Sequence, residues 1–113
     1  MKRNYPEDDL QRAVIKYIRL QYPHLLCFAV PNGGKRNPRE AARLKSQGVL
    51  AGVSDILLFW PGGMGAIELK AGNRKPSGQQ EYFGDRWEWC GGNFAVCNSL
   101  DGVVELLRKW GVK

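Results

Sequence analysis

The segment that most constrains the fold is a pair of apolar runs, residues 53–60 and 64–70, separated by Pro61-Gly62-Gly63. Short runs rich in branched and aromatic residues, bounded by glycine and proline, are typical of β-strands. Two strands with so short a connection pair antiparallel. The sequence therefore predicts a β-hairpin near the middle of the chain.

Helical patterns surround this hairpin. Apolar residues recur at helical spacing in residues 8–21, and Tyr22-Pro23 is expected to end that helix. A short basic helix is predicted over residues 38–47, with Gly48 as its stop. Two more helices are expected over residues 77–90 and 99–110, the second beginning at Ser99 as its N-cap.

Two further strands are predicted, over residues 25–30 and 93–97. The order of elements is then α β α β β α β α. Helices interleaved with strands, together with a hairpin, indicate an α/β domain with a central mixed sheet flanked by helices. A length of 113 residues suits a single domain of this kind.

The composition excludes several classes of protein. Hydrophobic residues make up 43% of the chain, too many for a disordered protein, but none of the apolar runs approaches the length of a membrane span. The charged residues 1–9 do not resemble a secretory signal, so we expect a soluble, intracellular, cytoplasmic protein. The chain has three cysteines without a CxxC pair and one histidine, which argues against a zinc site.

Basic residues outnumber acidic ones by 17 to 11, a net charge of +6, which favours nucleic acid as a partner. Apart from Lys70, which is considered separately below, seven of the basic residues lie between positions 35 and 75: Lys35, Arg36, Arg39, Arg43, Lys45, Arg74 and Lys75. The first four follow a glycine-rich turn and either contact DNA phosphates or form a solvated helix face. Asn32 either binds a phosphate or holds its own turn.

No nucleotide cofactor is expected. Gly33-Gly34-Lys35 lacks the GxxxxGK[ST] spacing of a P-loop.

Three charged residues lie inside the predicted hairpin, where apolar residues are expected. They are Asp55 in the first strand and Glu68 and Lys70 in the second. Carboxylates are disfavoured inside strands, and burying an unpaired charge is costly. These residues therefore need compensating partners, and a metal ion is one.

The pairing of the two strands decides whether these residues meet. With a loop over residues 61–64, Trp60 would pair with Gly65 and Asp55 with Lys70, and Asp55 would be the diagonal neighbour of Glu68 on the same face. A shift of two in the register would set the two acids directly opposite each other. A shift of one would place them on opposite faces of the sheet.

Two carboxylates on one face can share a Mg²⁺ ion, which prefers oxygen ligands and assists the hydrolysis of phosphodiesters. Lys70 could orient the attacking water or stabilise charge on the phosphate. The alternative is a salt bridge between Asp55 and Lys70 at the sheet edge, with Glu68 solvated.

Asp55, a gap of twelve residues and then Glu68-Leu69-Lys70 resemble the signature of the PD-(D/E)xK nucleases. A wider series resembles the VRR-NUC branch of that superfamily and extends from residue 7 to about residue 101. Its parts are Glu7…Gln11, Pro31-Asn32-Gly33-Gly34, Gly48…Gly52-Val53-Ser54-Asp55, Glu68-Leu69-Lys70 and Ser77…Gln80.

The resemblance implies a restriction-endonuclease-like fold and a Mg²⁺- or Mn²⁺-dependent DNA endonuclease. Asp55 and Glu68 would be metal ligands together with the backbone carbonyl of Leu69, and Lys70 would be the catalytic lysine. Glu7 would reach the metal from the first helix, and Gln80 would line the site from a later one.

Stand-alone members of this branch resemble phage-type proteins that act as homodimers on branched DNA such as Holliday junctions, in DNA repair and recombination. The same resemblance implies products with a 5′-phosphate and a 3′-hydroxyl. One alternative is a non-catalytic nucleic-acid-binding module on a nuclease-like fold, which would not need the intact acidic set. Another is a sequence-specific restriction enzyme, for which the chain offers no dedicated base-reading element.

Overall fold

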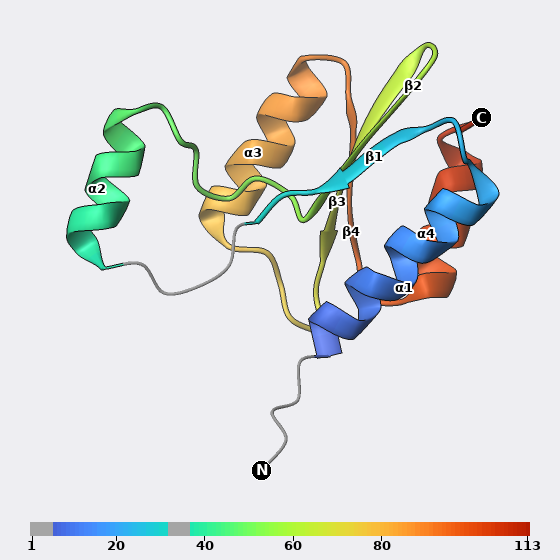
Figure 1. Cartoon of the computed structure of the whole chain (residues 1–113), viewed down its shortest axis with the longest axis horizontal. Helices are drawn as coiled ribbons and strands as arrows, with labels where there is room; N and C mark the ends of the chain where they lie inside the picture. Colours follow the sequence, from blue (N-terminus) through green and yellow to red (C-terminus); the bar gives the residue numbers. More distant parts are fainter. Residues whose placement is uncertain (1–5, 32–36) are drawn as a thin grey trace.

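The computed structural model describes residues 6–31 and 37–113. In this part of the chain the predicted order of elements is confirmed (Figure 1). The helices are α1 (Pro6–Gln21), α2 (Pro38–Ser46), α3 (Gly78–Trp89) and α4 (Leu100–Lys109), and the strands are β1 (Leu26–Ala29), β2 (Ile56–Trp60), β3 (Gly63–Leu69) and β4 (Asn93–Cys97). No described helix combines the length and the apolar character that crossing a membrane requires.

The strands form one mixed sheet in the order β1-β2-β3-β4. The β1–β2 and β2–β3 pairs are antiparallel, whereas β3 and β4 run parallel. A parallel pair requires a crossover connection, and α3 provides it. The prediction of an α/β domain with a mixed sheet flanked by helices is thus confirmed.

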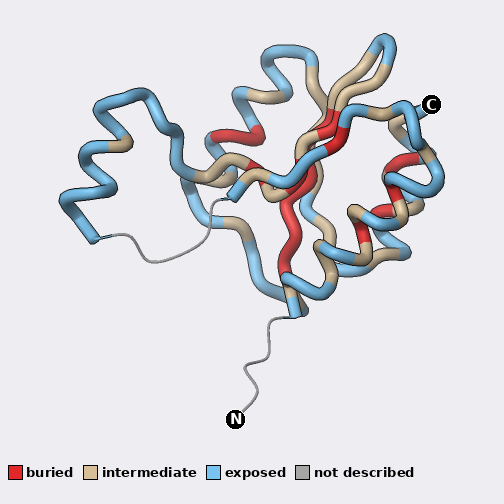
Figure 2. Tube along the Cα trace, viewed as in Figure 1, coloured by how far each residue is buried: buried red, intermediate tan, exposed pale blue. Residues whose placement is uncertain are grey.

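The two sides of the sheet are covered by different helices. On one side α1 and α4 pack against each other and against the strands, and on the other α3 packs against β3 and β4 (Figure 1). The main core lies under α1 and α4, and the buried segments converge there (Figure 2). It consists of buried apolar side chains: Val14, Ile18, Cys27, Ile56, Leu58, Ile67, Leu69, Val103 and Leu107.

The hairpin turn is tighter than predicted. Trp60 pairs with Gly63, so only Pro61 and Gly62 lie between the strands, and the predicted pair of Trp60 with Gly65 is wrong. Gly62 has a φ of +87°, which a side chain would strain, and a Cβ on Gly63 would lie 2.5 Å from the Trp60 indole. The two glycines therefore allow the shorter loop.

Strand β2 begins at Ile56, three residues later than predicted. The Asp55 side chain, rather than a backbone carbonyl, accepts a hydrogen bond from the Leu69 N–H of β3, and this ends the ladder. The other predicted bounds agree with the structure within two residues. Ser99 is the N-cap of α4 as expected, and Ser77 is the N-cap of α3.

Helix α2 stands apart from the rest of the domain. It has no buried residue, and within the described chain it packs against no other helix or strand (Figures 1 and 2). Asn37 caps its start by accepting a hydrogen bond from the Glu40 N–H at 2.7 Å. A cavity of about 1100 Å³ extends from α2 past residues 48–53 to the first turn of α3.

Candidate active site

Asp55 and Glu68 lie opposite each other where β2 and β3 meet. Ile56 pairs with Ile67, and continuing this register by one residue sets Asp55 against Glu68. The predicted diagonal arrangement, with Asp55 opposite Lys70, is therefore wrong. The tighter turn shifts the register by two, and because side chains alternate with a period of two, the acids stay on one face.

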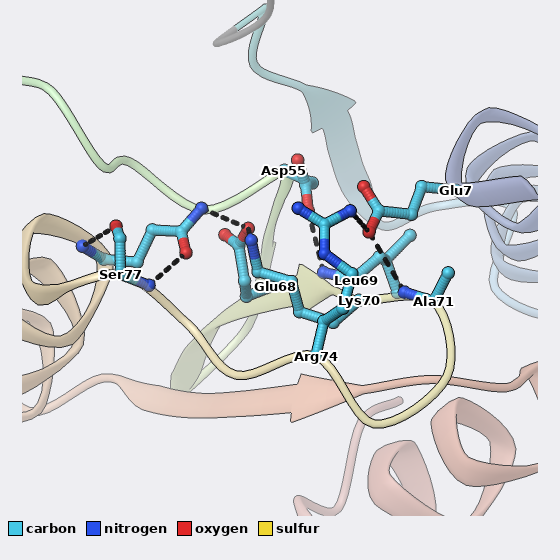
Figure 3. A network of polar contacts seen from close by, with 9 residues as sticks. Glu7, Asp55, Glu68, Leu69, Lys70, Ala71, Arg74 and Ser77 are labelled. Carbon is cyan, nitrogen blue, oxygen red and sulfur yellow. Dashed lines mark hydrogen bonds and ion pairs between the residues drawn. The ribbon is translucent and has the colours of Figure 1, made fainter. Parts of the chain in front are cut away.

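The backbone of β3 holds the Asp55 carboxylate in place. Its Oδ2 accepts a hydrogen bond of 2.7 Å from the Leu69 N–H (Figure 3). Burial raises the pKa of Asp55 above its usual range, the hydrogen bond from Leu69 opposes this shift, and the nearby negative charge of Glu7 adds to it. Asp55 therefore binds a proton more readily in this site than it would in water.

Glu68 is almost completely buried, with 2% of its surface exposed. Its Oε1 accepts a hydrogen bond from Gln80 Nε2 at 2.7 Å and lies 3.9 Å from Lys70 Nζ. Its Oε2 is also buried but has no hydrogen-bond partner among the described residues. Burial, and secondly the charge of Asp55, raise the pKa of Glu68 to about 8 from an ordinary value of 4.5.

The alternative of a solvated Glu68 beside an Asp55–Lys70 salt bridge is therefore wrong. Lys70 pairs with Glu68, and among the described ion pairs none joins it to Asp55. The register explains this outcome, because Lys70 follows Glu68 by two residues and so shares its face of β3.

Gln80 is held by the start of α3. Its N–H donates to the Ser77 Oγ at 3.2 Å, and its Oε1 accepts from the Ser77 N–H at 2.8 Å, which together form a capping box. With its Oε1 used in this way, the Gln80 Nε2 is directed at Glu68 (Figure 3). The local motif that starts the helix thus also orients a carboxylate 12 residues away.

The loop that returns from α2 packs closely on this turn. Gly52 has a φ of +87°, and a Cβ there would lie 2.5 Å from the Gln79 carbonyl and 2.8 Å from the Gln80 nitrogen. Only glycine fits so close an approach. Gln80 consequently borders both the carboxylate site and the cavity beside α2.

Of the three acids at the start of α1, Glu7 is the one that joins the network. Its Oε1 accepts hydrogen bonds of 3.0 Å from the Ala71 N–H and from Arg74 Nη1 (Figure 3). Asp8 and Asp9 are exposed, and Asp9 pairs with Arg12 at 3.0 Å. No local sequence pattern links Arg74 to an acid 67 positions earlier, so from sequence it is recognisable only as one of the basic residues.

The donor set fits a divalent cation such as Mg²⁺ or Mn²⁺. Asp55 and Glu68 provide hard oxygen ligands, and the buried Glu68 Oε2 lacks a hydrogen-bond donor. Within residues 6–31 and 37–113 no three His, Cys, Asp or Glu side chains form a ready metal cluster. Two carboxylates would therefore form the core of such a site. The ligand roles of Asp55, Glu68, Glu7 and the Leu69 carbonyl stay predictions.

Two of the predicted DNA-contacting residues lie on α2, which contacts no other described helix or strand. Arg39 and Arg43 are exposed on α2. Asn32, Lys35 and Arg36 fall outside the described residues. The structure thus places these two basic residues on the isolated α2, and contact with DNA stays a prediction.

The sequence matches no protein-family model and no curated protein. Two solved structures match the fold over nearly the whole chain. The first, a "VRR_NUC domain protein", has a TM-score of 0.73 and 21% identity, and the match covers 96% of this chain and 90% of that one. The chain has the VRR-NUC fold.

The second structure, a "VRR_NUC domain", agrees with this conclusion. Its TM-score is 0.65 at 21% identity, and the match covers 95% of this chain and 99% of that one. The fold expected from the motif series is therefore confirmed. In this VRR-NUC fold the Asp55 and Glu68 carboxylates lie at the junction of the hairpin strands, with Lys70 beside them.

Proposed function

We propose that this chain is a metal-dependent DNA endonuclease that hydrolyses phosphodiester bonds with Mg²⁺ or Mn²⁺. One observation carries the proposal: a partly buried carboxylate, Asp55, and a buried one, Glu68, lie opposite each other at the end of the hairpin with Lys70 beside Glu68, and one oxygen of Glu68 lacks a donor. A fold has little reason to bury such charges unless a cation compensates them. The VRR-NUC fold of the chain supports the same reading.

Each residue has a role that follows from its contacts. Asp55 and Glu68 would hold the metal ion, which supplies Lewis-acid activation of the phosphate and of water. The Leu69 N–H fixes Asp55, and Gln80 fixes Glu68, so neither carboxylate needs to reorganise during the reaction. Lys70, 3.9 Å from Glu68, would stabilise the charge that develops on the phosphate.

DNA is the substrate that the charge distribution supports. The chain carries a net charge of +6, and Arg39 and Arg43 on the exposed α2 could contact DNA phosphates. Such contacts position DNA without reading its sequence. Asn32, Lys35 and Arg36 remain part of this proposal on sequence grounds alone.

We further propose that the chain acts on branched DNA, such as a Holliday junction, as a homodimer. One carboxylate site can cut one strand, whereas a symmetric pair would present two sites to opposed strands. The unpacked α2 and the neighbouring exposed Val49 and Leu50 leave surface available for a second copy. Equilibrium sedimentation tests this part independently of cleavage.

The central experiment is a cleavage assay on a supercoiled plasmid and a four-way junction, with Mg²⁺, Mn²⁺ or EDTA. We expect cleavage with either metal and none with EDTA. Asp55→Ala, Glu68→Ala and Lys70→Ala should each abolish cleavage while DNA binding survives. Binding without cleavage by the wild type would instead indicate a non-catalytic module, and a wild-type rate from any of the three variants would refute the site.

A further inference from the structure

Among the described residues, Glu7 forms one ion pair, and its partner is Arg74. Its Nη1 lies 3.0 Å from Glu7 Oε1, the same oxygen that accepts the Ala71 N–H. Arg74 lies on the loop between β3 and α3, four residues after Lys70. Figure 3 shows its guanidinium joined to the Glu7 carboxylate.

The two partners differ in how they are held. The Arg74 side chain is 67% exposed and the Glu7 side chain 34% exposed, so water screens their attraction. A pair of this kind is weak and exchanges easily. Both groups also have stronger potential partners, because a divalent cation attracts a carboxylate and a guanidinium binds phosphate through two hydrogen bonds.

Glu7 is close enough to Asp55 to affect its protonation. Its charge contributes to the raised pKa of Asp55, so the three carboxylates share one electrostatic field. While Arg74 neutralises Glu7, the site attracts a cation less strongly. Moving the guanidinium to a phosphate would return that negative charge to the site.

We propose that Arg74 is a positioning residue that exchanges partners: it pairs with Glu7 in the free protein and releases Glu7 toward the metal ion when it binds a phosphate of the nucleic acid. This inference rests on the proposed function and adds a coupling between its two ligands. Because such coupling is reciprocal, metal should also favour nucleic-acid binding.

The test compares Arg74→Ala with Lys75→Ala in the full chain. Both variants remove one positive charge from the same loop, but Lys75 has no part in the described hydrogen bonds and ion pairs of the network. Calorimetric titration with Mn²⁺ in the absence of DNA is the first measurement. We expect Arg74→Ala to bind Mn²⁺ about 2- to 5-fold more tightly than Lys75→Ala, the scale of one exposed ion pair.

The second measurement is a double-mutant cycle with Glu7→Gln. If Arg74 acts through Glu7, Arg74→Ala and Lys75→Ala should have the same Mn²⁺ affinity once Glu7 is replaced. The third is binding of a duplex oligonucleotide in EDTA at several salt concentrations. Arg74→Ala should lower the slope of log affinity against log salt by about 0.9, as expected for one lost phosphate contact.

The outcomes separate the two proposals. If the wild type binds Mn²⁺ and cleaves DNA but Arg74→Ala has the Mn²⁺ affinity of Lys75→Ala, the partner exchange is refuted and the nuclease stands. An unchanged salt slope in Arg74→Ala refutes the phosphate contact. A wild type that neither binds Mn²⁺ nor cleaves DNA refutes both proposals together.

Discussion

The two faces of strand β3 have equal burial and opposite chemistry. Ile67 and Leu69 point into the core under α1 and α4, whereas Glu68 and Lys70 point to the side of α3. All four are at most 9% exposed. The apolar residues stabilise the sheet and define its register. Burying the charged residues costs free energy, which a bound ligand would offset. Core residues and candidate site residues thus alternate along one strand.

The largest effect on cleavage is expected for Glu68→Gln, which changes the charged face of β3 and leaves the apolar face intact. The variant keeps the shape of the side chain but removes its charge, so cleavage should fall by at least about 10²-fold, the scale of losing one stabilising group in an active site. The unfolding free energy should stay constant or rise, because a buried charge is removed. Steady-state cleavage and urea unfolding measure the two quantities.

Glu105→Gln is the matched control for that variant. This substitution removes the same charge from the exposed surface of α4, where Glu105 Oε1 lies 3.9 Å from Arg108 Nη1. Cleavage and stability should both match the wild type. A Glu68→Gln variant that loses stability while it keeps full activity would reverse the contrast between the faces.

On the core face, Leu58→Ala should have the opposite signature. Leu58 is fully buried, and removing its side chain leaves a cavity that should lower the unfolding free energy by about 2–5 kcal/mol. The carboxylates are not touched, so the activity of the folded fraction should persist at low temperature. Thermal melts and cleavage at 10–15 °C check both parts. Complete loss of activity in a well-folded Leu58→Ala variant would contradict the assignment of stability to one face of the strand and activity to the other.

The pH dependence of stability should also distinguish the faces. The pKa of Glu68 in the fold is about 8 against an ordinary value of 4.5, so the folded state binds an extra proton between these values. The stabilising contribution is complete below pH 4.5 and is lost as the pH rises through 8, with a slope of up to about 1.4 kcal/mol per pH unit. The raised pKa of Asp55 acts in the same direction.

Thermal melts in EDTA across this range, for wild type and Glu68→Gln, test the prediction. The difference in unfolding free energy should grow in favour of Glu68→Gln as the pH rises, because only the wild type must lose the Glu68 proton. Added Mn²⁺ should offset the loss in the wild type alone. Parallel curves for the two proteins in EDTA would show that Glu68 does not hold this proton.

The smallest effect is expected at the support of the site. Gln80→Ala removes the hydrogen bond to Glu68 Oε1 and should reduce cleavage about 10-fold, in line with one hydrogen bond to a charged group. Gln79→Ala, at the exposed neighbouring position, should not change the rate. Equal rates for both variants would mean that Glu68 is oriented without Gln80.

Most of the fold was predictable because its signals are local. Helix periodicity, the Ser99 cap and the glycines that follow α2, α3 and α4 lie within a few residues of the elements they define. The register was not predictable, since Pro61-Gly62-Gly63 permits loops of different length. Only the period of the pleat kept the acids together when the loop proved shorter.

The candidate site divides in the same way. Asp55, Glu68 and Lys70 stood out because charge is rare within apolar strands, whereas the use of Gln80 by Glu68 depends on how α3 packs on the sheet. The Glu7–Arg74 pair joins residues 67 positions apart and had no local signal. The isolation of α2 is likewise a property of tertiary packing that its own pattern does not reveal.

The close fit of Gly52 against α3 has a consequence for protein engineering. The backbone at Gly52 lies against Gln79 and Gln80. The segment that follows α2 is therefore held in place where it rejoins the domain and is not a flexible linker there. A transplanted arm of different sequence or length would have to rejoin upstream of this glycine. Chimeras joined downstream of it would displace the amide that steadies Glu68, however well the arm itself folded.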